Sequence, residues 1–175
     1  MAARLIGQLG YEAVTMTAIA EQAEASIGTL YDYFPDKQAI ALALKAQFTE
    51  EADAHWKALL CNPKGLTRAA LANLFVEGAL TIVREQPAYL PLMGASVAYT
   101  RSHSLRRPLR KTIASALRTM NPKLPEAGAF LSAEVIVQLI KGLLTVYREA
   151  SPKDRDKLAE EFKKVMRLYL MESLQ

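Results

Sequence analysis

Apolar residues recur along this chain at spacings of three and four positions, which is the period of an α-helix rather than the alternation of a β-strand. Ala and Leu are abundant and runs of β-branched residues are few, which also favours helices. Glycines and prolines interrupt the periodic segments and mark their ends. The sequence therefore predicts an all-α fold with about nine helices. They lie at approximately residues 1–9, 16–23, 27–33, 37–60, 66–86, 89–101, 105–120, 126–149 and 153–173.

The second and third predicted helices are short and adjacent, and they share an apolar seam. Ile19 and Ala23 lie on one face of the first, and Leu30, Tyr33 and Phe34 can face them from the second. Two short helices packed at a steep angle over one seam form a helix-turn-helix. Thr15 and Ser26 directly precede these helices, and their hydroxyls are suited to accept from the free amides at each helix start.

The long helix predicted at 126–149 has two apolar stripes instead of one. They consist of Leu131, Val135, Leu139 and Val146, and of Ile136, Ile140, Leu143, Leu144 and Tyr147. The last helix adds Leu158, Phe162, Val165 and Tyr169 at spacings of four, three and four. A helix with two apolar stripes needs cover on two sides. That cover comes either from the domain's own helices or from a twofold copy that completes a four-helix bundle.

The composition is that of a globular protein and offers little for catalysis. Of the 175 residues 51% are hydrophobic and 23% charged, which excludes a disordered or fibrous chain. A single cysteine and two histidines provide no disulfide framework and little metal chemistry. No phosphate-binding glycine loop and no convergent acid–base pair is apparent. We therefore expect no enzyme, no metal and no cofactor.

The sequence predicts no membrane-spanning helix. The longest uncharged run, residues 86–100, contains Pro87 and Pro91, and the first residues are too polar for a secretory signal. We expect a cytoplasmic protein without a membrane partner.

The net charge of +4 is distributed unevenly. Residues 1–40 contain two basic and five acidic side chains, a net charge of −3, and residues 41–175 carry a net charge of +7. A basic protein invites a nucleic-acid partner, but this excess lies away from the predicted helix-turn-helix.

The residues of that motif are more informative than its periodicity. GYEAVTM at residues 10–16, Ile19-Ala20 and SIGTLYDYFPDK at residues 26–37 closely resemble the N-terminal module of TetR-family transcriptional regulators. The resemblance implies a DNA-binding module at residues 1–37, followed by a helical effector-binding and dimerisation domain at residues 38–175. It implies a homodimeric repressor that binds double-stranded operator DNA and is released by a small-molecule effector.

The resemblance also implies which residues contact DNA. They are Thr15, Thr17, Ser26, Ile27, Gly28, Thr29, Tyr31, Tyr33 and Lys37. In this family the start of the second short helix reads base edges in the major groove, while the tyrosines and Lys37 match positions that contact phosphates.

Two departures from the family pattern bear on DNA affinity. The turn position normally held by glycine is Glu24, where a left-handed backbone costs about 1 kcal/mol and a carboxylate lies near phosphates. The first predicted helix is also shorter than the family's by about one to two turns, so upstream residues are expected to complete it. The alternative is a dimeric ligand-binding or protein-interaction module with lost or weakened DNA binding.

Residues of the later helices are candidates for an effector pocket and a dimer interface. Large apolar side chains with a few polar tips suit a small-molecule pocket and equally a plain core; they are Phe48, His55, Trp56, Phe75, Tyr89, Met93, Val97 and Tyr99. The resemblance favours the twofold bundle, with Leu139, Leu143, Val146, Phe162, Val165 and Tyr169 at the interface.

Overall fold

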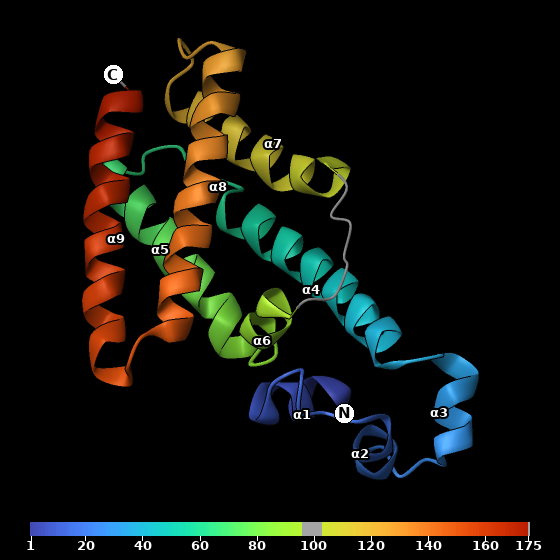
Figure 1. Ribbon diagram of the computed structural model, residues 1–175. Coiled ribbons are helices and arrows are strands. Elements are labelled where there is room, and N and C mark those ends of the chain that lie inside the picture. Colours follow the sequence, from blue (N-terminus) through green and yellow to red (C-terminus); the bar gives the residue numbers. More distant parts are fainter. Residues whose placement is uncertain (96–102, 175) are drawn as a thin grey trace. The chain divides into compact units, whose positions relative to one another are not determined.

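Helices form wherever the described part of the sequence is periodic (Figure 1). The computed structural model describes residues 1–95 and 103–174, with side chains at 1–95 and 108–174. Its helices are α1 (Ala2–Leu9), α2 (Met16–Gln22), α3 (Ile27–Tyr33), α4 (Lys37–Leu59), α5 (Arg68–Glu85), α6 (Tyr89–Gly94), α7 (His103–Met120), α8 (Glu126–Glu149) and α9 (Pro152–Ser173). The described residues contain no strand, and the all-α prediction is confirmed.

The predicted helix boundaries agree with the structure to within a few residues, except at α6. A helix was expected at 89–101, whereas α6 ends at Gly94 because the next residue, Ala95, adopts an extended backbone with φ −70° and ψ 139°. Residues 96–102 lie outside the described part of the chain.

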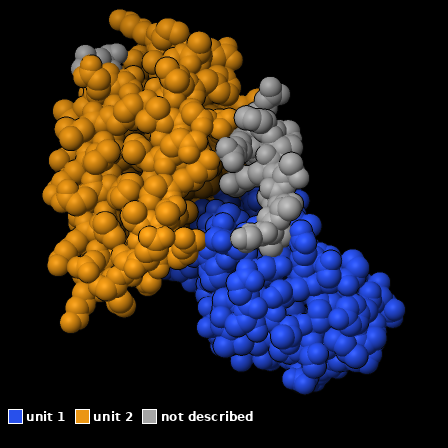
Figure 2. Space-filling view, viewed as in Figure 1, with its two compact units in different colours: residues 1–52, 82–100 blue, residues 53–81, 101–175 orange. Residues whose placement is uncertain are grey.

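The chain divides into two compact units, and each contains segments that are distant in sequence (Figure 2). Unit 1 comprises residues 1–52 and 82–100, and unit 2 comprises residues 53–81 and 101–175. The predicted boundary after residue 37 coincides with the start of α4, but unit 1 also includes the first part of that helix and the segment around α6.

The core of unit 1 joins the three short helices to α4 and α6. Ile6, Val14 and Ile19 are at most 3% exposed, and they belong to one cluster with Ala41 and Leu92. Leu30 and Phe34 pack against this cluster, as the shared apolar seam predicted. The position of the helix-turn-helix therefore depends on side chains from beyond residue 37.

The core of unit 2 is built on α8, which packs against α7 and α9 (Figure 1). Leu143 lies in a cluster with Val76 and Leu80 of α5 and Ala159 of α9, and Phe162 packs against it. Gly78 is required for close helix packing, because a Cβ there would lie 2.7 Å from Leu59 and 3.1 Å from Trp56. Ion pairs connect Arg110 of α7 to Glu134 of α8 and Lys163 of α9 to Glu77 of α5.

Helix α8 is also long and apolar enough to cross a membrane by length and composition alone. The expectation that no stretch could qualify was therefore stated too strongly. Helix α8 is this apolar because it is a core helix. It buries one of its two apolar stripes against neighbouring helices, and Ile136 and Leu143 of that stripe have no exposed surface. A packed core helix passes the same test, so this helix does not indicate a membrane protein.

Candidate nucleic-acid interface

Helix α2 begins at a side-chain cap and ends in a turn that uses a left-handed residue. The Thr15 hydroxyl accepts from the Ala18 amide at 3.1 Å. At the other end Glu24 has a φ of 53°, the one positive φ of a non-glycine residue among those described. The Glu24 amide donates to the Glu21 carbonyl at 3.1 Å, and the Ala25 amide donates to the Ala20 carbonyl at 3.0 Å. This pair of bonds is the Schellman motif, which normally has glycine at the left-handed position.

Ser26 is the N-cap of helix α3, and its hydroxyl makes two contacts with Thr29. The Ser26 hydroxyl accepts from the Thr29 amide at 3.0 Å and lies 2.8 Å from the Thr29 hydroxyl. The backbone at Ser26 is extended, with φ −68° and ψ 147°, as a capping residue requires. Both predicted N-caps, Thr15 and Ser26, are thus confirmed as caps, and the start of α3 is fixed.

No residue of α3 is buried. Tyr33 is 77% exposed, Tyr31 52% and Ile27 41%, and Gly28 and Thr29 are exposed as well. In a globular domain, large apolar and aromatic side chains that gather on one exposed helix indicate a contact surface. The proposed base-reading positions therefore share one exposed helix.

Lys37 differs from the other residues predicted to contact DNA, because its ammonium is engaged within the chain. Its Nζ donates to the carbonyl oxygens of Tyr11 at 3.0 Å and Glu12 at 3.1 Å. The same Nζ lies 4.6 Å from the centroid of the Tyr11 ring. Lys37 is half-buried, whereas Thr15, Thr17, Ser26 and the α3 residues are exposed.

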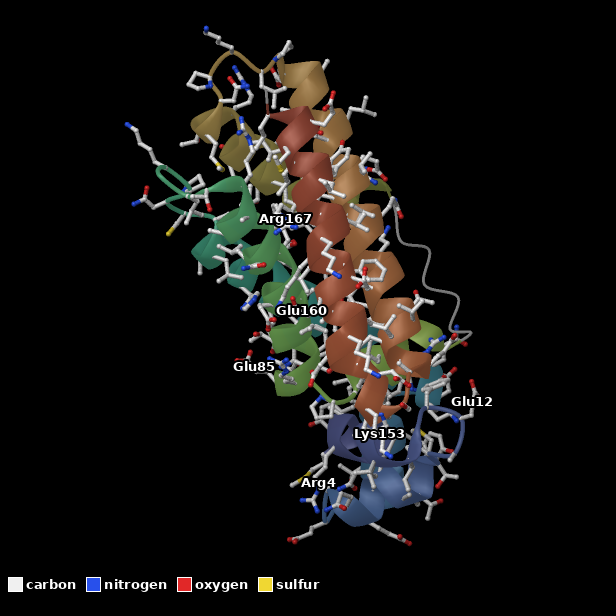
Figure 3. All side chains as sticks on the ribbon, turned by 90° about the vertical axis from the view of Figure 1, so that its left-hand side faces the viewer. Arg4, Glu12, Glu85, Lys153, Glu160 and Arg167 are labelled. Carbon is white, nitrogen blue, oxygen red and sulfur yellow. The ribbon has the colours of Figure 1, made fainter. Side chains whose placement is uncertain are left out.

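The first turn of α4 and the α1–α2 turn lie close together around this lysine. The Asp36 carboxylate accepts from the Ala39 amide at 2.7 Å and thereby caps α4. Burial raises the pKa of the Tyr11 hydroxyl, and the nearby carboxylates of Glu12 and Asp36 raise it further. Figure 3 labels Glu12 in this turn and Arg4 on α1.

The electrostatics of the module remain acidic. Its five carboxylates, at Glu12, Glu21, Glu24, Asp32 and Asp36, are all exposed. With Lys37 engaged by carbonyls, attraction to phosphate depends on hydroxyls and helix amides more than on net charge.

Comparison with known proteins identifies the family. Residues 1–44 match the bacterial regulatory proteins of the tetR family, and residues 68–170 match the tetracyclin repressor-like C-terminal domain. This chain belongs to the TetR family. The structural resemblance covers the whole TetR-family fold: a TetR-family transcriptional regulator from Streptomyces coelicolor superposes with a TM-score of 0.69 at 24% identity, covering 98% of this chain and 94% of that chain.

Two further proteins are similar to this TetR-family chain. The HTH-type transcriptional repressor KstR of Rhodococcus jostii (strain RHA1) is 45% identical over 56 residues, which is 32% of this chain and 24% of that protein. The chain thus spans about a quarter of the curated relative's length. The transcriptional regulator FadR from Bacillus subtilis, in complex with stearoyl-CoA, has a TM-score of 0.62 at 17% identity, covering 97% of this chain and 94% of that chain.

The residues predicted to line an effector pocket fall into two aromatic groups of this TetR-family chain. In unit 1 the rings of Phe48 and Tyr89 have centroids 6.3 Å apart. In unit 2 the rings of Trp56 and Phe75 have centroids 6.1 Å apart, and His55 packs edge-on to Trp56. His55 Nε2 lies 3.1 Å from the carbonyl oxygen of Gly78. Met93 is 37% exposed, and Val97 and Tyr99 lie outside the described residues.

Two clefts of unit 2 lie outside the predicted effector pocket. One has a volume of about 420 Å³ between α7 and α8, and includes Lys111, Arg118 and Phe130. The other, of about 460 Å³, includes Arg68, Met120, Arg167 and Met171; Figure 3 labels Arg167 on α9. Both lie on exposed helix faces, where periodicity alone gives no sign of a cleft.

The predicted dimer residues separate into core and surface positions. Leu143 is fully buried in the chain's own core and Phe162 packs there, so Leu143 is not available to a partner subunit. Val146 and Val165 are 38% and 47% exposed, while Leu139 and Tyr169 are half-buried. Three more large apolar side chains are exposed on the same two helices: Leu131 at 68%, Leu168 at 64% and Met171 at 51%. Leu131 belongs to the first predicted stripe of α8, whereas Leu168 and Met171 were not predicted at the interface.

Proposed function

We propose that this TetR-family chain is a DNA-binding transcriptional repressor that acts as a homodimer and is released from its operator by a small-molecule effector. One observation carries the proposal: α3 has no buried residue, is rigidly capped by Ser26, and exposes Ile27, Tyr31 and Tyr33. A short exposed helix after a tight turn is the element that enters the major groove in helix-turn-helix proteins. We expect no catalytic activity.

The DNA-binding part of this proposal is tested by fluorescence anisotropy with the DNA upstream of the protein's own gene. Saturable binding should weaken steeply as salt is raised, because each phosphate contact releases counterions. Thr29→Ala should reduce sequence discrimination, since Thr29 lies at the start of α3 where base edges are read. Thr119→Ala, at an exposed threonine on α7 of unit 2, is the matched control and should leave DNA binding unchanged.

A second candidate function is favoured by a specific observation. Five exposed carboxylates on residues 1–40, Glu24 among them, oppose phosphate binding. The alternative is a dimeric ligand-binding or protein-interaction module whose DNA binding is lost or weak. An intact dimer by sedimentation, together with no DNA binding at low salt, supports this alternative over the repressor.

The homodimer is supported by the apolar surface on α8 and α9. Leu131, Val146, Val165, Leu168 and Met171 are each at least 38% exposed, and surface of this kind marks protein interfaces. Pairing with a twofold copy supplies the cover that the α8 stripe containing Leu131 and Val146 lacks within the chain.

The interface is tested by placing charge on it. Val165→Glu should shift the sedimentation profile from dimer to monomer. The matched control Glu161→Gln, on the same exposed helix, should leave the profile unchanged. A Val165→Glu protein that remains dimeric excludes this surface as the interface.

The aromatic group around Trp56 offers a test for effector binding. The structural neighbour FadR is in complex with stearoyl-CoA, which makes stearoyl-CoA a rational first probe. Trp56 is the one tryptophan of the chain and is 3% exposed beside His55 and Phe75, so its fluorescence reports on this region. Binding of the effector should change this fluorescence and release the operator at the same concentration.

A further inference from the structure

Lys37 matches a position where this family places a phosphate contact, yet its ammonium faces inward. Two of its three N–H donors have partners on the α1–α2 turn, the carbonyls of Tyr11 and Glu12 at 3.0 and 3.1 Å. The face of the Tyr11 ring lies 4.6 Å away on another side. A half-buried ammonium with two carbonyls and an aromatic face is held strongly, because charge-assisted bonds and the cation–π contact act together.

The two carbonyls need this donor. Gly10 reverses the chain after α1 with a φ of 80°, and residues 11–13 form a turn before α2. Within the described residues neither the Tyr11 nor the Glu12 carbonyl accepts from a backbone amide. Lys37 satisfies both: the bond to Tyr11 is partly buried, where a carbonyl without a partner is costly, and the bond to Glu12 is exposed.

The hydrogen bonds of Lys37 connect the two ends of the helix-turn-helix segment. Lys37 is the first residue of α4, and Tyr11 lies just beyond α1 on the way to α2. The bond from Lys37 to Tyr11 therefore joins segments that are 26 residues apart in sequence. It closes a loop that contains all of α2 and α3. A second hydrogen bond from the same ammonium, to the Glu12 carbonyl, also joins the α1–α2 turn to α4.

We propose that Lys37 is a positioning residue: together with the Tyr11 ring and the carbonyls of Tyr11 and Glu12, it forms an internal staple that holds α2 and α3 at a fixed orientation to α4, instead of contacting a DNA phosphate. The proposal deepens the proposed DNA-binding function. The staple itself exists without DNA, so it can be tested without it.

The first experiment measures amide hydrogen exchange of the free protein. Lys37→Met keeps the length of the side chain and removes the ammonium, and Tyr11→Leu removes the ring while the carbonyls remain. The amides of Gly10 and Ile19, which flank the turn and are hydrogen-bonded, should exchange about tenfold faster in Lys37→Met. Lys64→Met, at an exposed lysine of unit 2, is the control and should leave both rates unchanged.

The second experiment measures how operator affinity depends on salt. A positioning residue lowers the affinity by the same factor at every salt concentration, so the slope of log K against log salt in Lys37→Met should equal that of the unmodified protein. A phosphate contact predicts a slope smaller by about 0.9. Lys37→Arg, whose guanidinium can also donate to two carbonyls, should restore most of the affinity.

The outcomes distinguish a positioning role of Lys37 from a phosphate contact. A slope reduced by about 0.9 in Lys37→Met overturns the proposal that Lys37 positions the helices instead of contacting a phosphate. Unchanged exchange in both Lys37→Met and Tyr11→Leu also overturns it. If the unmodified protein binds no DNA, the proposed function fails, while faster exchange in Lys37→Met still establishes the staple.

Discussion

Glu24 occupies the one position in the described chain where the backbone conformation and the side chain conflict. Its φ of 53° lies in the left-handed region, which costs a non-glycine residue about 1–2 kcal/mol. Replacing it by glycine removes that cost, but glycine also makes the unfolded chain more flexible, which offsets about 0.4–1 kcal/mol. Because the Glu24 side chain is exposed, little packing is lost. Glu24→Gly should therefore stabilise the protein by about 0.5–1 kcal/mol.

The effect of the Glu24 charge must be distinguished from the effect of its left-handed backbone. Glu24→Gln removes the carboxylate and keeps the left-handed cost, so its stability should stay within about 0.5 kcal/mol of the parent. Urea unfolding followed by far-ultraviolet circular dichroism gives the midpoints. Exchange of the Ala25 amide, bonded to the Ala20 carbonyl, reports on the turn itself.

The two variants should agree in DNA binding and differ in stability. Both remove a negative charge near the expected phosphates, so both should bind operator several-fold more tightly at low salt, with the gain shrinking as salt is raised. Only Glu24→Gly should also slow exchange of Ala25. If glycine and glutamine give the same urea midpoint and the same exchange rate, the assignment of strain to this φ is wrong.

Three further changes test the packing and electrostatics of the fold. Ser26→Ala removes the cap of α3 and should lower stability by about 1 kcal/mol by urea unfolding, with a matching loss of operator affinity. Gly7→Ala places a Cβ 3.0 Å from the Pro87 Cβ, so thermal melting should show a net loss of about 1 kcal/mol despite alanine's better helix propensity; a higher melting temperature contradicts this close contact. A hydrogen bond from Gln138 and the nearby Arg110 guanidinium hold the pKa of Glu134 below its ordinary value. The ionised carboxylate therefore contributes stability above the ordinary pKa, and this stability is lost as pH falls through the lowered pKa. Glu134→Gln should lose less stability than the parent between about pH 5 and pH 3, and equal losses in titrated melting curves would show that this carboxylate contributes nothing.

Local chemistry made the helices and the caps predictable. Thr15 and Ser26 were identified as caps because a hydroxyl directly precedes each apolar period. Glu24 was identified through the family resemblance, in which glycine holds this turn position, and the backbone there is indeed left-handed. These features depend on neighbours within a few residues, so the sequence contains them directly.

Features that depend on distant contacts were not predictable in the same way. The partners of Lys37 are 25 and 26 residues away, and the spacing of charges gives no sign of them. Leu143 and Val146 are equally apolar, but only the packing of α5 and α9 decides that the first is buried and the second exposed. The exposed Leu168 of α9 could have been found from the face it shares with Val165, three positions earlier.

The composition of unit 1 limits how this protein can be cut or recombined. A segment ending at residue 37 would contain every proposed base-reading residue but would lack Ala41, Phe48, Ala88 and Leu92, which complete the core beneath them. The exposed apolar surface left behind would favour aggregation of such a fragment. A chimeric regulator that borrows this DNA specificity must therefore transfer α6 and the first half of α4 with the helix-turn-helix, although these segments are separated by 29 residues of unit 2 in the chain. The proposed DNA specificity therefore depends on packing between segments that are distant in sequence, and the helix-turn-helix segment alone is not sufficient to transfer it.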